Sequence, residues 1–354
     1  MLSETQQIAS DSSEQLSVID SCVANDWNGY LRRSGSGHLF LRAEWDDVFA
    51  VYGLKTLRVA AVRGDRVVGV LPLVEQRSIL LGRQLVSLPW FDTAGVVADD
   101  SAAIHALVAK AIEAAEVRKS QIVQLRQGAP IDVDSPIRTD KLLMRLRLEP
   151  DEDRLWDRFN PKVRNQVRKA EKSGLRAEQV GNEHLPEFYR IYSQNMRDLG
   201  SPSHHVRFFE AVFAAFPAEA SLFIVRFEGK AIGGALTMAN GDRLEVPWAS
   251  SLKRYNRLCV NHLLYWTILQ HACRGGFEMF HFGRSTADSG TYRFKKQWGA
   301  EGEPLHWYYL TSRQRPVGAA MSPDGSYGWG ARLWKRLPLW LTRRLGPKLI
   351  AGIP

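Results

Sequence analysis

Hydrophobic and polar positions along the chain predict two successive blocks of strands and helices. Apolar residues recur at strand or helix spacing at 60–74, 102–119 and 121–127 in the first block, and at 223–239, 243–251, 261–276 and 278–282 in the second. Residues 87–99 predict a strand followed by a turn. Residues 60–74 and 223–239 each predict two strands around a tight charged turn. Because helices and strands are interspersed along the chain, the pattern predicts an α/β (α+β) fold.

The two hairpin segments are similar to each other. Arg66-Val67-Val68-Gly69 superposes on Lys230-Ala231-Ile232-Gly233 after a shift of 164 residues (66 to 230), close to half of the 354-residue chain. Such a shift favours an internal duplication of one domain type, although a single hairpin match also arises by chance. We expect an N-terminal domain at 1–149, a C-terminal domain at 150–313, and a linker with a basic aromatic tail at 314–354.

Composition and charge exclude several classes of protein. Hydrophobic residues make up 45% of the chain, which excludes disorder, and 47 Lys and Arg against 38 Asp and Glu leave a net charge of +9 that favours anionic partners. Three cysteines without a CxxC pair do not predict a disulfide framework or a zinc site. The chain has no signal-peptide pattern and no apolar run of roughly 18 residues. We therefore expect a soluble cytoplasmic protein.

A basic helix is predicted at residues 160–174. Asn160 is suited to cap its start, Pro161 to be its first residue and Gly174 to end it. Its apolar residues share one face, and the cations of another face include Arg164, Arg168 and Lys172. These cations predict either a surface that binds phosphate groups or an ordinary solvated face.

The segment after residue 278 predicts a strand whose end carries polar side chains. Phe280 and Phe282 fit a half-buried strand, and Gly283 is expected to break it. Arg284 and Ser285 would then lie just beyond the carboxyl end of the strand, where ligands commonly bind in α/β proteins. The alternative is a structural junction between a strand and a helix.

A short helix is predicted directly after this strand. Asp288 or Ser289 would cap it. Tyr292 and Lys295 lie within it, and we take Tyr292 as a candidate substrate-binding residue. Lys295 is harder to assign to packing than the aromatic residues around it.

Sequence motifs of several enzyme classes are absent. The chain has no GxSxG, HExxH, Walker A or Rossmann glycine pattern, so hydrolase, NTPase and dehydrogenase functions lack their required residues. His204 and His205 are adjacent, but no Cys, Asp or Glu pattern completes a metal-binding set around them. We expect no metal and no permanently bound cofactor.

The repeated hairpin, the basic helix VRNQVRKAEKSG and the ending FGRS…TYRFKKQWGAE together resemble the FemAB family of aminoacyltransferases, which are built from two tandem GNAT-like (acetyltransferase-fold) domains. The chain is most similar to the FemAB-related branch associated with exosortase, PEP-CTERM and exopolysaccharide loci. The similarity extends over roughly residues 30–312 and is densest in the second half.

The resemblance implies transfer of an amino acid or another acyl group from aminoacyl-tRNA to a glycan or muropeptide precursor of the cell envelope. Residues 294–299 match a FKxxFG-like motif of the family, so the resemblance makes Lys295 the residue that stabilises the negative charge developing on the acyl carbonyl. Gly283, Arg284 and Ser285 match the strand end that precedes this motif. Arg284 is expected to stabilise an anionic group beside Lys295.

The chain departs from the family pattern at two positions. His281 stands where an acidic residue is usual, and Arg284 replaces the second glycine of a GGS-like motif. Both departures bear on the muropeptide acceptor and leave acyl transfer in place. Glu245 and His281 are the candidates for the general base.

The relation to GNAT domains adds acyl-CoA as an alternative donor. GNAT domains bind the pyrophosphate with a glycine-containing turn ahead of a helix. The equivalent stretch before the helix at Asn261 has no glycine, and Arg254 and Arg257 would bind phosphate through their side chains. The alternative function is an acyl-CoA-dependent N-acetyltransferase, and a non-catalytic nucleic-acid binder is a third. The first half has no such turn, so we expect its domain to be a degenerate copy.

The tail combines cations with aromatic and aliphatic residues and has no acidic residue from 329 to 354. This composition predicts either a peripheral contact with the inner face of the cytoplasmic membrane or a helix packed on the body of the protein. A membrane contact would suit a lipid-linked acceptor.

Overall fold

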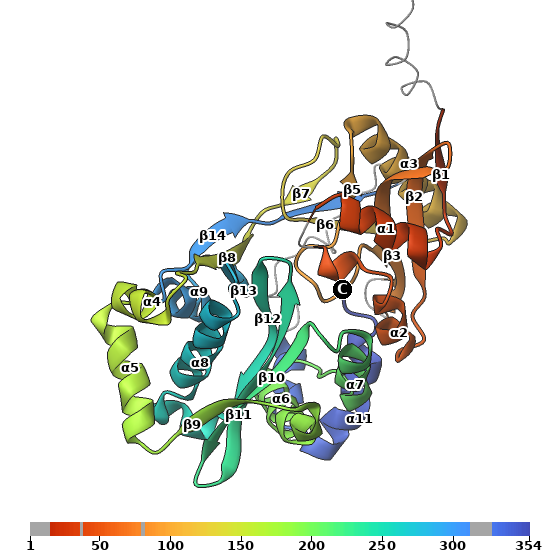
Figure 1. Ribbon diagram of the computed structural model, residues 1–354. Coiled ribbons are helices and arrows are strands. Elements are labelled where there is room, and N and C mark those ends of the chain that lie inside the picture. The colour runs from red at the N-terminus through yellow and green to blue at the C-terminus, as the bar shows by residue number, and fades with distance from the viewer. Residues whose placement is uncertain (1–14, 36–37, 79–81, 312–327) are drawn as a thin grey trace, which may run out of the picture.

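The computed structural model describes residues 15–35, 38–78, 82–311 and 328–354, and it consists of two mixed β-sheets with helices packed against them (Figure 1). The first sheet contains β1 (Leu16–Ile19), β2 (Thr56–Arg63), β3 (Arg66–Ser78), β4 (Gly82–Val86), β5 (Val97–Ala98), β6 (Ile122–Gln127), β7 (Ile137–Arg138) and β15 (His306–Leu310). Its order is β1-β2-β3-β4-β6-β15-β7, with β5 on β3.

The second sheet has the order β14-β8-β13-β12-β11-β10-β9. Its strands are β8 (Lys141–Arg147), β9 (Arg176–Val180), β10 (Ala220–Phe227), β11 (Lys230–Asn240), β12 (Arg243–Ser251), β13 (Met279–Thr286) and β14 (Glu301–Pro304). The α/β fold class predicted from the sequence is confirmed.

Eleven α-helices and three short 3₁₀ helices lie in the described ranges. The α-helices are α1 (Ala24–Arg33), α2 (Trp45–Ala50), α3 (Ser101–Val117), α4 (Glu152–Arg158), α5 (Pro161–Lys172), α6 (Leu185–Leu199), α7 (Val206–Ala215), α8 (Val260–Arg274), α9 (Gly290–Lys296), α10 (Gly328–Trp334) and α11 (Leu339–Ile350). The 3₁₀ helices are η1 (Leu39–Leu41), η2 (Asn182–His184) and η3 (Lys253–Leu258). Within these ranges, no helix is both long enough and apolar enough to cross a bilayer.

The repeated hairpins have the same register and the same irregularity. In the hairpin of β2 and β3, Ala61 pairs with Gly69 and a bulge follows. In the hairpin of β10 and β11, Val225 pairs with Gly233 and a bulge follows at the same place. Both members of each pair are 164 positions from their counterparts (61 to 225, 69 to 233), so the predicted equivalence is confirmed.

The two equivalent glycines are required by close packing. A Cβ at Gly69 would lie 2.8 Å from Cβ of Ala98, and a Cβ at Gly233 would lie 2.6 Å from Cγ1 of Val260. Carbon atoms in proteins pack at about 3.5–4 Å, so neither position has room for a side chain. The same residue type is therefore needed at the same point of both hairpins for the same steric reason.

The repeat continues beyond the hairpins. In the first half, α3 connects to β6, which pairs with β4 in parallel. In the second half, α8 connects β12 to β13, and these two strands also pair in parallel. A helix between two parallel strands is the crossover connection that parallel pairing needs. Each half thus has a hairpin, a crossover helix and a parallel strand pair.

Each sheet includes one strand from outside its own half of the chain. β8 comes before the second-half elements, and it pairs antiparallel with β13 in the second sheet. β15 comes after them, and it returns to the first sheet to pair antiparallel with β6. The connections from β7 to β8 and from β14 to β15 therefore both cross between the sheets (Figure 1). This exchange joins the two halves through backbone hydrogen bonds.

The strand that contains Gly283 is longer than predicted. Gly283 was expected to break the strand, but β13 continues to Thr286, with a bulge between His281 and Arg284. The reason is β8, whose residues Leu143 to Lys141 pair with residues 284–286. Arg284 and Ser285 therefore lie within the strand, and not beyond its carboxyl end.

The two halves also share one hydrophobic core. The segment 87–99, predicted as a strand and turn, is mostly a loop from which only Val97 and Ala98 form a strand. Phe91 in this loop packs with Trp45 of α2, and Trp45 lies 4.6 Å from Phe216 between ring centroids. The aromatic side chains of this loop pack in the core between the two sheets. The loop therefore does not form the strand that its apolar pattern predicted.

The predicted boundaries of the two short helices are confirmed. The side chain of Asn160 accepts from the backbone N–H of Val163, and Pro161 is the first residue of α5. Gly174 follows α5 in the left-handed conformation with φ of +85°. Of the two candidate caps for α9, Ser289 is the one that accepts from the backbone of the helix.

The tail packs on the body of the protein. α11 lies beside α6 (Figure 1), and Nε of Arg343 donates to Oγ of Ser193 at 3.0 Å. Nε1 of Trp90 donates to the carbonyls of Ile350 and Ile353 at 3.2 and 3.0 Å. Of the two structures predicted for the tail, the packed helix is therefore present.

Candidate functional site

The bulge of β13 turns two backbone carbonyl groups toward α9. Gly283, inside the bulge, has φ of +73°, a conformation that residues with a Cβ rarely adopt. Lys295 of α9 donates from Nζ to the carbonyl oxygens of Gly283 and Arg284, at 3.0 and 2.8 Å. The glycine thus permits a backbone shape that binds an ammonium group.

Lys295 is buried but charged through most of the neutral pH range. Only 8% of the residue is exposed, and burial lowers its pKa to about 8, while the charge of Asp92 raises the pKa and that of Arg284 lowers it. A protonated amine has three N–H groups, and the two carbonyls use two of them. The third is available to a further acceptor, such as an oxygen atom of a substrate.

Asp92 connects the first half of the chain to the bulge. One carboxylate oxygen accepts from the backbone N–H of Arg284 at 2.9 Å, and the other accepts from its guanidinium at 2.7 Å. The Arg284 guanidinium also lies over the ring of Trp307, 5.3 Å from its centroid. Nε1 of Trp307 in turn donates to the carbonyl of Asp92 at 3.1 Å. Arg284 is therefore held by both halves of the protein.

Arg126 is a buried cation next to Trp307 and close to Asp92 and Arg284. It is 1% exposed, its guanidinium donates to the carbonyl of Phe91 at 2.8 Å, and it lies 4.6 Å from the ring centroid of Trp307. Burial, together with the charge of Arg284, lowers its pKa to about 9, although Asp92 opposes this effect. Its Nε has no hydrogen-bond partner.

The charges at this junction are unequal. Arg126, Arg284 and Lys295 each interact electrostatically with Asp92. Buried cations are costly unless an anion compensates them. A group of three cations around one carboxylate therefore favours a further negative charge, whether on a bound ligand or on an oxygen that becomes negative during a reaction.

The two candidates for the general base form a pair on the neighbouring strands. Nδ1 of His281 on β13 lies 3.5 Å from a carboxylate oxygen of Glu245 on β12, and both side chains are largely buried. The same carboxylate oxygen accepts from the Asn240 side chain at 2.6 Å. Nε2 of His281 has no hydrogen-bond partner. His281 is two residues before Gly283 on β13, so the pair lies close to the bulge.

Two further candidates from the same segment differ in burial. Ser285 is 4% exposed, and its Oγ has no hydrogen-bond partner. Tyr292 is half-buried and packs against the hydrophobic core of the second half. Both lie on the elements that carry the bulge and Lys295.

The basic face of α5 is only partly near this site. The side chain of Asn160 donates to the carbonyl of Gln297 at 2.7 Å, which attaches the start of α5 to the end of α9. Arg164 pairs with Asp157 at 3.7 Å, and Arg168 lies over the ring of Trp156. Lys172 is at the opposite end of α5, roughly 15 Å along the helix axis. The three predicted phosphate-binding residues therefore spread away from Lys295.

The remaining predicted cations precede α8. Arg254 and Arg257 lie in η3 and are exposed, and Asn261 is the second residue of α8. Cys259 is the N-cap of α8 and has the left-handed conformation, with φ of +60°. Both arginines thus lie at the helix end where the backbone dipole is positive, which favours an anionic group.

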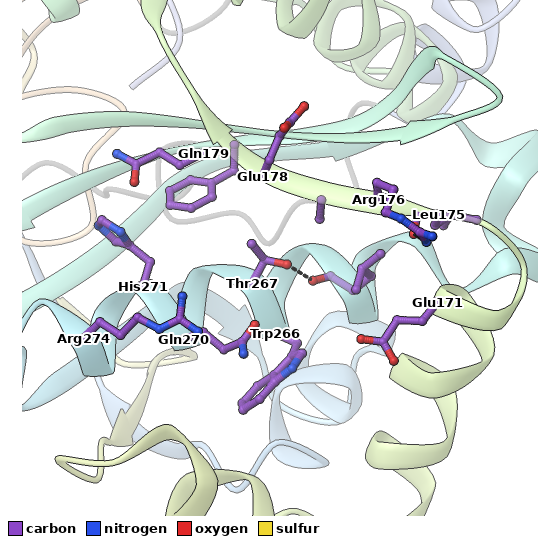
Figure 2. A pocket seen from close by; sticks show the side chains of 13 residues that line it. Glu171, Leu175, Arg176, Glu178, Gln179, Trp266, Thr267, Gln270, His271 and Arg274 are labelled. Carbon is purple, nitrogen blue, oxygen red and sulfur yellow. Dashed lines mark hydrogen bonds between the residues drawn. The ribbon is translucent and has the colours of Figure 1, made fainter.

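A cavity of the second half does not include Lys295 in its lining. It has a volume of about 580 Å³ between α5, β9 and the C-terminal half of α8 (Figure 2). Figure 2 shows side chains of α8 and β9 around it, and its charged residues are two acidic and two basic ones, Glu171, Glu178, Arg176 and Arg274. Because these charges balance, the cavity has no excess positive charge to attract an anionic acyl donor. The junction of Arg126, Arg284 and Lys295 does have such an excess.

Sequence reasoning identified Lys295, Arg284 and Gly283 but missed the residues of the first sheet and of β15. These residues are distant from Arg284 in sequence: Asp92 is 192 positions away, Arg126 is 158 positions away and Trp307 is 23 positions away. Asp92 lies in a segment read as a strand and turn, and Arg126 lies within a strand. An arginine inside an otherwise buried strand was the one sequence feature that could have drawn attention to it.

A family model of the acetyltransferase (GNAT) domain matches residues 158–296. This range contains the bulge, Lys295 and the pair of His281 and Glu245. No curated protein matches the chain in sequence.

Several solved structures share the fold at low identity. FemX has a TM-score of 0.64 at 17% identity, with 83% of this chain and 97% of that chain covered. L-PGS from Bacillus licheniformis has a TM-score of 0.55 at 12% identity, covering 92% and 96%. A tandem GNAT protein from the clavulanic acid biosynthesis pathway has a TM-score of 0.54 at 12% identity, covering 85% and 100%. The chain thus has a tandem GNAT-like fold, carries an acetyltransferase (GNAT) domain in its second half, and is an acyltransferase.

Proposed function

We propose that the chain transfers an acyl or aminoacyl group to an amine or hydroxyl of a cell-envelope glycan or peptidoglycan precursor. The observation that carries this proposal is Lys295, whose ammonium group is oriented by two backbone carbonyls and keeps one N–H for a substrate. Acyl transfer places negative charge on the carbonyl oxygen, and a preoriented cation stabilises that charge.

The reaction that these residues support begins when the acceptor nitrogen or oxygen attacks the acyl carbon. The carbonyl oxygen becomes negative and accepts from Lys295, and the carbon then expels the oxygen of tRNA or the sulfur of coenzyme A. The attacking group loses its proton to a base, for which Glu245 and His281 are the candidates, 3.5 Å apart. Arg284 supplies a second positive charge beside Lys295.

The donor is aminoacyl-tRNA or acyl-CoA, and both carry phosphate groups. Arg254 and Arg257 at the start of α8, with Asn261, would bind donor phosphates, because the helix dipole adds to their charge. Arg164 and Arg168 on α5 would extend a phosphate-binding surface from the α9 side, and Lys172 would bind only a long donor such as tRNA.

The acceptor class is inferred from the neighbours and from the sequence resemblance. FemX shares the fold, and so does the C-terminal domain of a putative lysylphosphatidylglycerol synthetase from Agrobacterium fabrum, with a TM-score of 0.56 at 15% identity. The resemblance to the branch associated with PEP-CTERM and exopolysaccharide loci favours a glycan over a muropeptide. A lipid-linked acceptor would also require contact with the cytoplasmic membrane.

Donor binding and single-turnover transfer test this function. We would measure binding of acetyl-CoA and of aminoacyl-tRNA to the full chain and to Lys295→Met, and then transfer of labelled acyl groups to amino-glycan and muropeptide acceptors. We expect one donor to bind both proteins, with transfer reduced on Lys295→Met. The proposal fails if neither donor binds at millimolar acetyl-CoA or micromolar tRNA, or if folded Lys295→Met keeps full transfer.

An acyl-CoA-dependent N-acetyltransferase is the second candidate. The matching family model, which describes an acetyltransferase domain over residues 158–296, favours it. Saturable binding of acetyl-CoA that is lost on Arg254→Gln with Arg257→Gln, without any binding of aminoacyl-tRNA, would select this function.

A further inference from the structure

The tail concentrates exposed apolar side chains. Among the described residues, ten large hydrophobic side chains are exposed, and half of them belong to the tail: Leu333, Trp340, Leu345, Leu349 and Ile353. Trp340 is 66% exposed. Scattered single apolar residues are ordinary on a protein surface, but a cluster of this kind marks an interaction site.

The inner face of α11 is fixed to the protein. Thr342, Gly346 and Ile350 are buried, and a Cβ at Gly346 would lie 2.9 Å from the backbone nitrogen of Ser203. Arg343 donates to Ser193, and Trp90 donates to the carbonyl of Ile350. Because these contacts orient the helix, its outer face is presented in one fixed direction.

The outer face of α11 has two parallel stripes. Leu341, Leu345 and Leu349 recur every four residues and form an apolar stripe, of which the last two are exposed. Trp340, Arg344 and Lys348 also recur every four residues, and all three are exposed. An apolar stripe beside a basic stripe headed by tryptophan is typical of helices that lie in the membrane interface.

The charge of the tail selects the partner. Residues 328–354 contain no acidic residue, and Lys335 and Arg336 between α10 and α11 are exposed as well. Cations next to phosphate head groups bind anionic lipids, and tryptophan and leucine insert among the acyl chains. A nucleic acid would match the cations but would leave the exposed leucine and isoleucine side chains in water.

We propose that the outer face of α11, with the exposed cations between α10 and α11, binds the surface of an anionic lipid bilayer. None of these residues lies at Lys295, so membrane binding by this face is independent of the acyl-transfer chemistry. The inner face stays attached to α6, and the membrane therefore contacts the folded protein and not a detached tail.

Vesicle co-sedimentation of the full chain tests the proposal. We would compare vesicles of phosphatidylcholine with vesicles that contain phosphatidylglycerol, at low and at physiological salt. We expect binding to the anionic vesicles only. The variants Trp340→Ser with Leu349→Ser, and Arg344→Gln with Lys348→Gln, should each weaken partition by roughly tenfold or more.

A matched control lies on α3, far from the tail in sequence. Val117, at the end of α3, is 74% exposed and Lys119 close to it is exposed as well, so Val117→Ser with Lys119→Gln removes the same chemistry elsewhere. This control should bind anionic vesicles like the unchanged protein, and all variants should keep the same melting temperature. Tryptophan fluorescence should shift to the blue on binding, and Trp340→Ser should lose most of that shift.

Three results would overturn the proposal. The first is the absence of binding to phosphatidylglycerol vesicles. The second is equal binding by the tail variants and the Val117 control. The third is unchanged lipid binding together with weakened tRNA binding or a changed oligomeric state in the tail variants, which would assign the face to RNA or to a second copy of the chain.

Discussion

Asp92 in the first half of the chain accepts two hydrogen bonds from Arg284 in the second, one from its backbone and one from its guanidinium. The two residues are 192 positions apart. The bond closes the junction at which Lys295 lies, so the two halves depend on each other for the shape of the site.

Replacing Asp92 tests this dependence. Asp92→Asn removes the anion that raises the pKa of Lys295, so the pKa should fall further below about 8 and the alkaline limb of the rate profile should move to lower pH. Because Arg284 is partly exposed, we expect a loss of about 1–2 kcal/mol in the free energy of unfolding. Transfer rate against pH and urea unfolding are the measurements.

The control for Asp92→Asn is Asp132→Asn, since the Asp132 side chain is 90% exposed. It should leave both the rate profile and the stability unchanged. An unshifted alkaline limb in Asp92→Asn would show that this carboxylate does not influence Lys295.

Lys295 gives a second prediction through its charge. Its ammonium is protonated below about pH 8 and neutral above, so the transfer rate should fall as the pH rises through that value. Lys295→Met should lower kcat by roughly 10²- to 10³-fold at pH 7, with a smaller change in donor binding. Steady-state kinetics between pH 6 and pH 10 would measure both effects.

Lys295→Arg separates charge from proton loss. Arginine stays charged throughout this range, so whatever activity the variant keeps should not fall as the pH passes about 8. An identical alkaline limb in Lys295→Arg would assign the titration to another group.

Arg126 gives a third prediction, in which stability and activity change in opposite directions. Arg126→Met replaces a fully buried cation with an apolar side chain of similar length, which should leave the free energy of unfolding unchanged or raise it by about 1–2 kcal/mol. The rate of transfer should fall by about tenfold, since the site loses one of its cations. Urea unfolding and transfer assays on the same preparation would measure the two effects.

The exposed Arg66, the first residue of β3 after the turn of the first hairpin, is a control for the same substitution. Arg66→Met should change neither property. A strongly destabilised but fully active Arg126→Met would instead assign Arg126 to packing.

The fourth prediction concerns the equivalent glycines. A methyl group at position 233 would lie 2.6 Å from Val260, so Gly233→Ala should lower the free energy of unfolding by about 1–3 kcal/mol. Gly290→Ala is the control, because no atom lies within 4 Å of its added Cβ. Equal melting temperatures for the two variants would contradict the close contact between β11 and α8.

The elements that sequence reasoning predicted correctly depend on local features. The cap at Asn160, the start of α5 at Pro161 and the two hairpins follow from residues within a few positions of each other. The shift of 164 residues predicted from the sequence also relates the paired residues of the two hairpins. The same bulge and the same closely packed glycine occur at equivalent positions in both.

The elements that it predicted wrongly depend on distant segments. Gly283 is a bulge and not a strand end, because β8 extends the pairing past it. The loop around Asp92 is not a strand, because its aromatic residues fill the core between the sheets. Neither partner is near in sequence, so no local pattern could indicate the outcome.

The sequence by itself determined the fold class and the repeat, and it made Lys295 a candidate residue, since hydrophobic spacing, caps and the FKxxFG-like motif are all read from neighbouring residues. The tertiary structure alone decided which groups surround that lysine. Asp92 comes from a loop of the first half, Arg126 from β6 and Trp307 from β15, and they meet Arg284 of β13 because the two sheets pack together. That packing depends on burial and hydrogen bonds between distant segments, which form together on folding.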